Sequence, residues 1–243
     1  MRIAVISDIH GNATALRQVL QDIDACSVDR IFCLGDNIGY GPEPEAVVRM
    51  LQERSIPSVV GNHELAVKDP DYLEFFNPAA RLSLEKTMHS ISSDTLAYIT
   101  GLPDFIIMFN CRFVHGFPPD SIITYMFEMQ APYVEKIMAE MDEHICFIGH
   151  THEPAIIEYH DNAIKVTPLG KQTLYLDPKQ KYIINAGSVG QPRDGSGDAK
   201  YVIFDNAQFT LEVKYVSYDV SDTIKKIHAA GLPKQHALRL LWS

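Results

Sequence analysis

The sequence predicts an α/β protein built as a four-layer αββα sandwich, with two mixed β-sheets packed face to face and flanked by helices. Two observations support this fold class. The first sixty residues alternate short apolar runs with amphipathic segments, an order typical of parallel strands joined by helices. From Ile145 onward, short strand-like runs dominate instead. The 243 residues suffice for a sizeable core but are few for two domains, so we expect one domain over residues 1–243.

The first third of the chain contains three short apolar runs that predict buried strands, at residues 3–7, 30–35 and 57–61. Asn12 can cap a helix over residues 13–23, in which apolar side chains recur at helical spacing. A second helix should begin near Pro44, because proline is favoured in the first turn, and continue to about Gln52. This βαβαβ order predicts parallel strands covered by helices.

The middle of the chain contains two segments that we expect to be helical insertions near the site, at about residues 70–100 and 120–142. The first contains two helix-like stretches with a break around Asn77-Pro78. The second predicts a helix over residues 125–141 that Pro132 interrupts.

Strands are expected between and after these insertions. Residues 105–116 predict a strand pair, and residues 155–169 predict a hairpin whose turn is Asp161-Asn162. Four further apolar runs predict strands, at residues 172–177, 181–187, 200–205 and 209–216. A last helix over residues 222–230 should stop at Gly231.

The charge and composition narrow the class of protein. Acidic residues exceed basic ones by 31 to 21, and the resulting formal charge of −10 disfavours binding of long nucleic acids. A small anionic substrate would need locally positive charge, for which metal ions are the obvious source. No run of about 18 uncharged apolar residues predicts a membrane span. The N-terminal apolar run is too short for a signal peptide, so we expect a cytoplasmic protein. The four cysteines form no C-x-x-C pair and are expected to be structural thiols.

Polar residues of a few types follow the predicted strands closely. The apolar runs are followed by carboxylate, amide or imidazole side chains, which are Asp8, His10, Asp36, Asn62, His63, His115, His150 and His152. In an open α/β sheet, ligands bind in the crevice at the carboxyl ends of the strands. If these strands are neighbours with the same polarity, all eight side chains converge on one place.

A divalent metal site explains this pattern better than separate structural roles. Alone, a histidine at a strand end is usually a hydrogen-bonded loop residue, but that interpretation would have to hold independently at five strand ends. Close together, the imidazoles and carboxylates would be partly desolvated and unsatisfied. A divalent cation removes this conflict, because it needs neutral imidazole and ionised carboxylate. Mixed nitrogen and oxygen donors favour Mn, Fe, Zn, Co or Ni over Ca.

Two ions fit the number of donors better than one. Seven candidate ligands are available, namely Asp8, His10, Asp36, Asn62, His115, His150 and His152. One catalytic zinc would use fewer. Asp36 stands alone after its strand and is the natural candidate to bridge two ions. Two ions roughly 3.5–4 Å apart are typical of phosphoester hydrolases.

The motifs, taken together, resemble those of the calcineurin-like metallophosphoesterase superfamily. They are "DIH", "GDNIGYG", "GNHE", "VHG" and "GHTH", in this order between Asp8 and His152. The later stretch "NAGSVGQPRDG" is similar to the small bacterial and archaeal phosphodiesterase-like branch. Two positions depart from the common pattern, since Ala186 stands where proline is frequent and Glu64 stands where aspartate is frequent.

The resemblance implies a role for each of these residues. One metal would be held by Asp8, His10 and His152 and a second by Asn62, His115 and His150, with Asp36 bridging the two. His63 would face the substrate, as acid or as phosphate contact, and Asn62 is also a candidate contact of the substrate. Asn12 and Arg193 are further candidates for contacts with phosphate oxygens, Arg193 because its guanidinium can offer two parallel donors. Residues 70–100 match no catalytic motif, so the substrate stays open.

These roles predict a hydrolase that attacks a phosphodiester with a hydroxide bridging two divalent ions, of which Mn²⁺ is favoured. A phosphomonoesterase or protein phosphatase of the same superfamily is the alternative, including cleavage of dinucleoside polyphosphates. A non-catalytic scaffold, as in the retromer subunit of the superfamily, would have an incomplete site, whereas every predicted ligand and His63 are present here. No P-loop or Rossmann fingerprint indicates a nucleotide-binding module. The oligomeric state is left open, and a homo-oligomer is compatible with the sequence.

Overall fold

The computed structural model describes residues 1–242 and contains two mixed sheets, which confirms the predicted fold class. The five-stranded sheet has the order β2-β1-β10-β11-β8, where β1 is Arg2–Ile6, β2 is Arg30–Cys33, β8 is Thr173–Tyr175, β10 is Ala199–Asp205 and β11 is Thr210–Val216. Within it only β1 and β2 are parallel.

The six-stranded sheet has the order β3-β4-β5-β9-β6-β7. Its strands are β3 (Phe105–Met108), β4 (Cys111–Val114), β5 (Ile145–Ile148), β6 (Ala155–His160), β7 (Ala163–Pro168) and β9 (Lys181–Asn185). Strands β4, β5 and β9 are parallel to one another, and the outer strands on both sides are antiparallel. The carboxyl ends of β4 and β5 therefore lie at the same edge of this sheet.

The main core lies between the two sheets. The inward side chains of both sheets meet there, with Phe32 and Phe204 contributed by the first sheet and Phe113 and Phe147 by the second. The Phe32 and Phe113 rings stack at 4.1 Å across the interface, and the Phe147 and Phe204 rings lie 6.0 Å apart. Since hydrophobic burial and aromatic packing stabilise this layer, it fixes the position of one sheet relative to the other.

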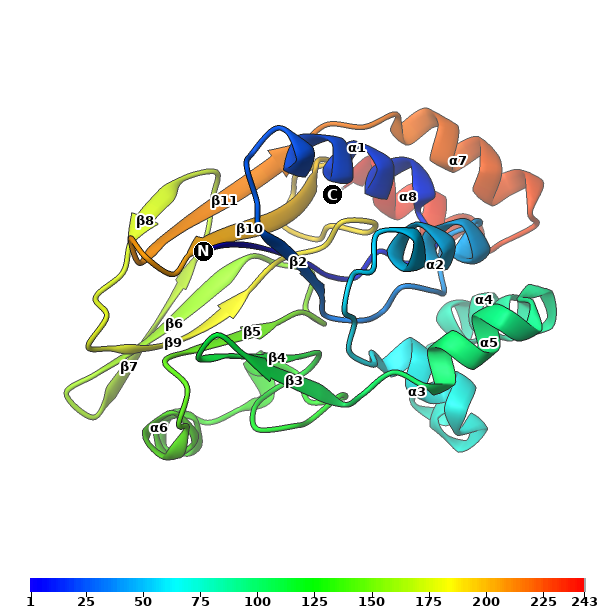
Figure 1. The fold of residues 1–243 in the computed structure, drawn as a ribbon. Helices are drawn as coiled ribbons and strands as arrows, with labels where there is room; N and C mark the ends of the chain where they lie inside the picture. Colours follow the sequence, from blue (N-terminus) through cyan, green and yellow to red (C-terminus); the bar gives the residue numbers. More distant parts are fainter. Residues whose placement is uncertain (243) are drawn as a thin grey trace.

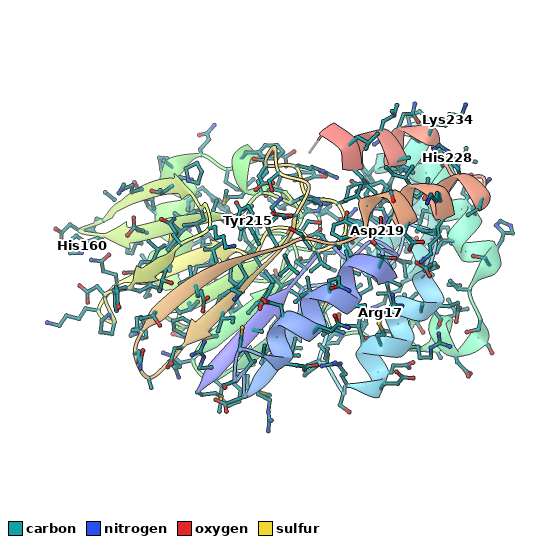
Figure 2. The ribbon with its side chains drawn as sticks, turned by 90° about the horizontal axis from the view of Figure 1, so that it is seen from above. Arg17, His160, Tyr215, Asp219, His228 and Lys234 are labelled. Atoms are coloured by element: carbon teal, nitrogen blue, oxygen red, sulfur yellow. The ribbon has the colours of Figure 1, made fainter. Side chains whose placement is uncertain are left out.

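Helices cover the outer faces of the sheets, as Figure 1 shows. Helices α1 (Ala13–Asp24) and α2 (Pro44–Glu53) pack their apolar faces on the five-stranded sheet. Helix α6 (Ala131–Glu140) packs on the other side of the molecule, against the six-stranded sheet. Helices α7 (Val220–Ala229) and α8 (Lys234–Trp242) pair with each other. In Figure 2, α7, which follows the labelled Asp219, runs beside α1, which carries Arg17, and Thr14 donates to Asp222 there at 2.9 Å.

The segment between α2 and β3 forms a separate helical group at one end of the sheets (Figure 1). It contains α3 (Asn62–Lys68), the 3₁₀ helix η1 (Pro70–Phe75), α4 (Pro78–Ser90) and α5 (Ser93–Thr100). A small apolar cluster holds the group together and includes Leu73, Leu84 and Ile99. The predicted break at Asn77-Pro78 is confirmed, because the Asn77 side chain accepts from the Ala80 amide and caps α4.

Three local expectations differ from the structure. Residues 57–61 form only an isolated bridge between Ser58 and Cys33, because the chain leaves the sheet edge at once to begin α3 after Gly61. Pro132 does not interrupt a helix but lies in the first turn of α6, where its missing N–H is not needed. Before it, only Met126–Glu128 form a 3₁₀ turn, η2. Helix α8 was not predicted. Within residues 1–242, none of the helices combines the length and the apolar composition that a membrane span requires.

Candidate metal centre

The structure brings the eight predicted side chains together at the carboxyl ends of β1, β2, β4 and β5. Asp8 and His10 follow β1, Asp36 follows β2, His115 follows β4, and His150 and His152 follow β5, while Asn62 and His63 begin α3. All of them are buried except Asn62, which is half-buried. Three overlapping groups of donor atoms result, Asp8-His10-His152, His10-Asp36-His63 and Asp36-His115-His150. The predicted convergence is therefore observed, whereas the ligand role of each residue stays a prediction.

The first group pairs two imidazoles with a carboxylate that has a free oxygen. The Nε2 atoms of His10 and His152 lie 3.2 Å apart, and they are 3.8 and 3.3 Å from Asp8 Oδ1. Each Nδ1 donates to a backbone carbonyl, that of Ile38 for His10 (3.1 Å) and that of Gln191 for His152 (2.5 Å). Both Nε2 atoms therefore turn a lone pair towards each other and towards Asp8 Oδ1, which is buried without a hydrogen-bond partner.

The second group brings imidazole and oxygen atoms equally close to one another. His115 Nε2 lies 3.0 Å from Asn62 Oδ1, 3.1 Å from His150 Nδ1 and 3.4 Å from Asp36 Oδ2. His115 Nδ1 donates to the Leu34 carbonyl at 2.8 Å, and His150 Nε2 donates to the Ile123 carbonyl at 3.2 Å. His150 thus presents Nδ1 to the centre where the other histidines present Nε2. A divalent cation is the group that satisfies several acceptors aimed at one point.

Asp36 lies between the two groups. Its Oδ2 is 3.6 Å from His10 Nε2 and 3.4 Å from His115 Nε2, so one carboxylate oxygen faces an imidazole of each group. Its Oδ1 accepts from the backbone amide of His63 at 2.9 Å, which fixes the rotation of the carboxylate. This position suits the predicted bridging role.

His63 lies at the edge of the centre and has few polar contacts. Its Nε2 is 3.9 Å from Asp36 Oδ2, and its Nδ1 is buried without a hydrogen-bond partner. The ring packs edge to face against His10, Tyr40 and Phe76, at centroid distances of 4.6, 4.6 and 4.8 Å. Aromatic packing therefore holds the imidazole in place and leaves a nitrogen available for a ligand.

The backbone is strained at five of the candidate ligands. Asp8, His10, Asp36, His150 and His152 all have positive φ, between 49° and 69°. A non-glycine residue in this left-handed region costs about 1–2 kcal/mol, and such residues cluster at functional sites. The tight turns aim successive side chains back into one volume instead of letting the chain continue outward.

Electrostatics favour neutral imidazoles beside carboxylates. Burial holds the pKa of His10 and His152 well below the usual range and lowers the pKa of His150 to about 3 and that of His63 to about 4. Burial likewise raises the pKa of Asp8 to about 6.

Asp36 and His115 form the charged pair of the centre. Burial opposes the charge on Asp36, but His115 and His63 together outweigh it and hold the pKa of Asp36 well below its usual range. Burial also opposes the charge on His115, yet Asp36 raises its pKa to about 9. Neutral imidazole with ionised carboxylate is the donor set that divalent transition metals take, so the residues fit such ions once the His115 proton leaves.

Glu64 holds part of the site in place, a role that was not predicted from the sequence. Its buried carboxylate accepts from the backbone amides of Asp36 (2.8 Å), Asn37 (2.7 Å), Ile38 (3.3 Å) and Gly61 (2.9 Å). It therefore positions the turn that carries Asp36 relative to the start of α3. An acidic residue three positions after an N-cap is a capping-box signal, and that signal was available in "GNHE".

The two predicted phosphate contacts differ in their surroundings. Asn12 caps α1 through the Ala15 amide (3.1 Å), accepts from Thr223 Oγ1 (3.0 Å) and donates to the Gly190 carbonyl (3.0 Å) and Tyr218 (3.3 Å). These contacts use its amide for structure and do not favour a contact with phosphate. Arg193 is half-buried, donates to Gln191 Oε1 at 3.3 Å and leaves Nε without a partner. Its substrate role, like that of Asn12, stays a prediction.

Comparison with known proteins defines the class. The family model described as the calcineurin-like phosphoesterase superfamily domain matches residues 1–208, and the chain belongs to this family. The predicted resemblance is thus confirmed, and membership supports a phosphoric ester hydrolase with bound metal.

Individual relatives are similar over nearly the full chain. The chain is 38% identical over 244 residues to "Uncharacterized protein MJ0912" of Methanocaldococcus jannaschii, covering 98% of this chain and 96% of that protein. The crystal structure of a metallophosphoesterase from Sphaerobacter thermophilus has a TM-score of 0.85 and 36% identity, covering 100% of this chain and 98% of that one. The hypothetical protein PH1004 from Pyrococcus horikoshii shares the fold, with a TM-score of 0.81 at 17% identity. The match covers 98% of this chain and 97% of the PH1004 chain.

Proposed function

We propose that this protein is a phosphodiesterase that uses two divalent transition-metal ions, with Mn²⁺ favoured. The observation that carries the proposal is the position of Asp36 between two groups of buried imidazole and oxygen donor atoms, each of which converges on one point. One ion would satisfy only one of these groups. Two ions would bring a charge of +4 against −2 from Asp8 and Asp36, so the centre would attract an anionic phosphoester despite the acidic surface.

The ligands follow from the two groups. Asp8, His10 and His152 would hold one ion, Asn62, His115 and His150 would hold the other, and Asp36 would contact both. When bound, the ions supply an activated water as nucleophile and positive charge for the phosphoryl oxygens.

The chain itself contributes a proton donor and an anion contact. His63 would give a proton to the departing oxygen through Nε2, the ring nitrogen that lies 3.9 Å from Asp36 Oδ2. A bound phosphoester anion would raise the pKa of His63 from about 4, since a nearby negative charge favours imidazolium. Arg193 would neutralise charge on the non-bridging oxygens, because its Nε has no partner in the protein.

The preference for a diester rests on the motif "NAGSVGQPRDG", whose Gln191 carbonyl orients His152. We also propose that the protein acts in the cytoplasm on a small phosphoester, without long nucleic acid or a membrane as partner. Its four cysteines are free thiols, as expected in a reducing compartment. The formal charge of −10 opposes a polyanion.

A direct assay tests the proposal. The protein, stripped of metal and reloaded with Mn²⁺, should hydrolyse bis(p-nitrophenyl) phosphate faster than p-nitrophenyl phosphate. Faster cleavage of the monoester would reassign it as a phosphomonoesterase. No cleavage of either ester with any of Mn²⁺, Fe²⁺, Co²⁺, Ni²⁺ or Zn²⁺ would identify a non-catalytic scaffold.

A further inference from the structure

A cavity opens directly beside the candidate metal centre. Its volume is about 270 Å³, and Asn62 and His150 line it while also belonging to the centre. One wall comes from η1 and the residues after it, and the other comes from residues 123–128, before α6. A single ligand could therefore place its phosphate at the centre and a neighbouring group of the same molecule in this cavity.

The walls of this cavity are largely aromatic. Tyr72, Phe75 and Phe76 form one side. Tyr125 on the other side is stacked between His150 at 3.7 Å and Phe127 at 4.9 Å, so it presents its edge to the cavity. Tyr40 also lines the cavity and packs against His63. Aromatic rings on both walls favour a flat aromatic guest, because stacking on one wall, edge contacts with the other and ring burial all stabilise it.

Phe75 lies at this cavity without packing that explains its position. Its side chain is 79% exposed, and Tyr72, at 5.8 Å, is its one aromatic neighbour among the described side chains. Ile123, on the opposite wall, is 45% exposed. Exposed large apolar side chains that face each other across a cavity are typical of a ligand-binding site.

Polar groups on this cavity select among aromatic guests. Glu128 lies on the lining, and its Oε2 accepts only a long bond of 3.4 Å from the Tyr125 amide. Asn77 uses its oxygen to cap α4, which leaves its amide donor for a ligand. A phenyl or tyrosyl ring would leave these groups unused, whereas a nucleobase has apolar faces and a hydrogen-bonding edge.

We propose that this cavity binds the nucleobase of a nucleotide phosphoester, with the base stacked on Phe75 and an exocyclic amino group donating to Glu128. The proposal rests on the proposed function, because it assigns the substrate class of the same centre. The size of the cavity agrees with one base, since 270 Å³ is near the lower end of small-molecule sites. The amino-bearing bases of AMP and CMP fit Glu128, whereas uracil has no such donor.

Binding to the Mn²⁺-loaded full chain tests this assignment separately from turnover. Calorimetry would compare AMP, UMP, ribose 5-phosphate and inorganic phosphate. AMP should bind at least tenfold more tightly than ribose 5-phosphate, as expected for one stacked base. Phe75→Ala should lower this ratio at least fivefold. Tyr175→Ala, at a ring that is 86% exposed on β8 and far from the cavity lining, should leave the ratio unchanged.

Glu128→Gln tests the edge of the base. It should reduce the preference for AMP over UMP at least threefold, while the affinity ratio of UMP to ribose 5-phosphate stays the same. Equal affinities for AMP and ribose 5-phosphate, or a ratio that Phe75→Ala leaves unchanged, would overturn the nucleobase site. Tighter binding of phenyl phosphate than of AMP would overturn it in favour of a phenolic ester. AMP selectivity without hydrolysis of any ester would refute the proposed function and leave the nucleobase site supported.

Discussion

Replacement of Glu64 by glutamine tests whether this residue positions the turn that carries Asp36. The carboxylate accepts four backbone N–H groups, two on each oxygen. Glutamine keeps the shape and one accepting oxygen, but its NH₂ group would face two backbone donors. Glu64→Gln therefore removes two hydrogen bonds without creating a cavity.

The magnitude follows from the type of bond lost. A hydrogen bond to a charged group contributes about 1.5–3 kcal/mol, so two lost bonds set an upper limit of about 3–6 kcal/mol. The net loss of free energy is smaller than this limit, because the buried charge of Glu64 is itself unfavourable. Burial and the repulsion of Asp36 raise the pKa of Glu64 to about 7, and glutamine carries no charge. We expect a net loss of about 2–3 kcal/mol in the free energy of unfolding, or roughly 4–12 °C in Tm for a chain of this size.

Thermal unfolding with EDTA and with Mn²⁺ measures this change, and titration with Mn²⁺ measures the function of the turn. Metal affinity should fall about 10–100-fold, because residues that orient ligands have effects of this size. Glu45→Gln is the matched control. Glu45 also caps a helix start, through Ser92 and Thr95, but it is half-buried and far from the centre. It should change Tm by less than about 3 °C and leave Mn²⁺ affinity unaltered.

The reasoning fails if Glu64→Gln behaves like the control in both measurements. A variant that loses stability but binds Mn²⁺ as the wild type does would limit Glu64 to a structural role. Normal stability with weakened metal binding would instead show that the turn is held by other contacts and that the Glu64 charge acts on the ions.

Four further predictions follow from other parts of the structure. His63→Ala should keep its metal but lose about 10²–10⁴-fold in kcat on esters with poor leaving groups, and unchanged rates on such esters would exclude a proton donor. Asp36→Asn should lose one or both ions, which elemental analysis of the purified variant measures against the wild type. Asp194→Asn should lower stability by about 3 kcal/mol in urea unfolding, because it removes the carboxylate that lies 2.5 Å from Nζ of the buried Lys200 and leaves that charge with only the Ser196 carbonyl as acceptor in the described chain, and the double variant with Lys200→Met should recover most of this loss. His236 is buried and its pKa is lowered by that burial, so it resists protonation in the folded state and should contribute a loss of stability of at most about 1.4 kcal/mol per pH unit as pH falls below 6.5, in addition to the loss from the buried histidines of the centre. His236→Phe should reduce the slope by this contribution, and an identical slope in both proteins would exclude His236 from it.

The positions of the candidate ligands could be predicted because strand direction and residue type are both visible in the sequence. Asp8 and Asp36 follow parallel neighbours, as do His115 and His150, so each pair meets at one edge of its sheet. That the two edges also meet depends on Gly149, where a Cβ atom would lie 2.0 Å from Ser7 Oγ. The sequence shows this glycine but not the close approach that requires it.

Other features depend on contacts between distant segments and could not be predicted. The hydrogen bonds of Asn12 with Tyr218 and Thr223 join it to the far end of the chain, and no local pattern around Asn12 indicates them. The orientation of His150, with Nδ1 inward, is set by the Ile123 carbonyl in an irregular segment. The third expected strand does not form, because its apolar run ends at Gly61. There the Gly61 amide donates to the Glu64 side chain, and α3 begins. Apolar content predicts burial there, but a local hydrogen bond decides the direction of the chain.

Each of the two donor groups draws side chains from both sheets. His152 comes from the six-stranded sheet to join Asp8 and His10, and Asp36 comes from the five-stranded sheet to join His115 and His150. On the proposed assignment, each cation is a cross-link between the halves of the sandwich. Free metal at a hundred times its dissociation constant would add about 2.7 kcal/mol of stability per ion. The stability of the folded protein would then depend on the concentration of free manganese around it. Loss of the metal would lower the amount of folded protein as well as its activity.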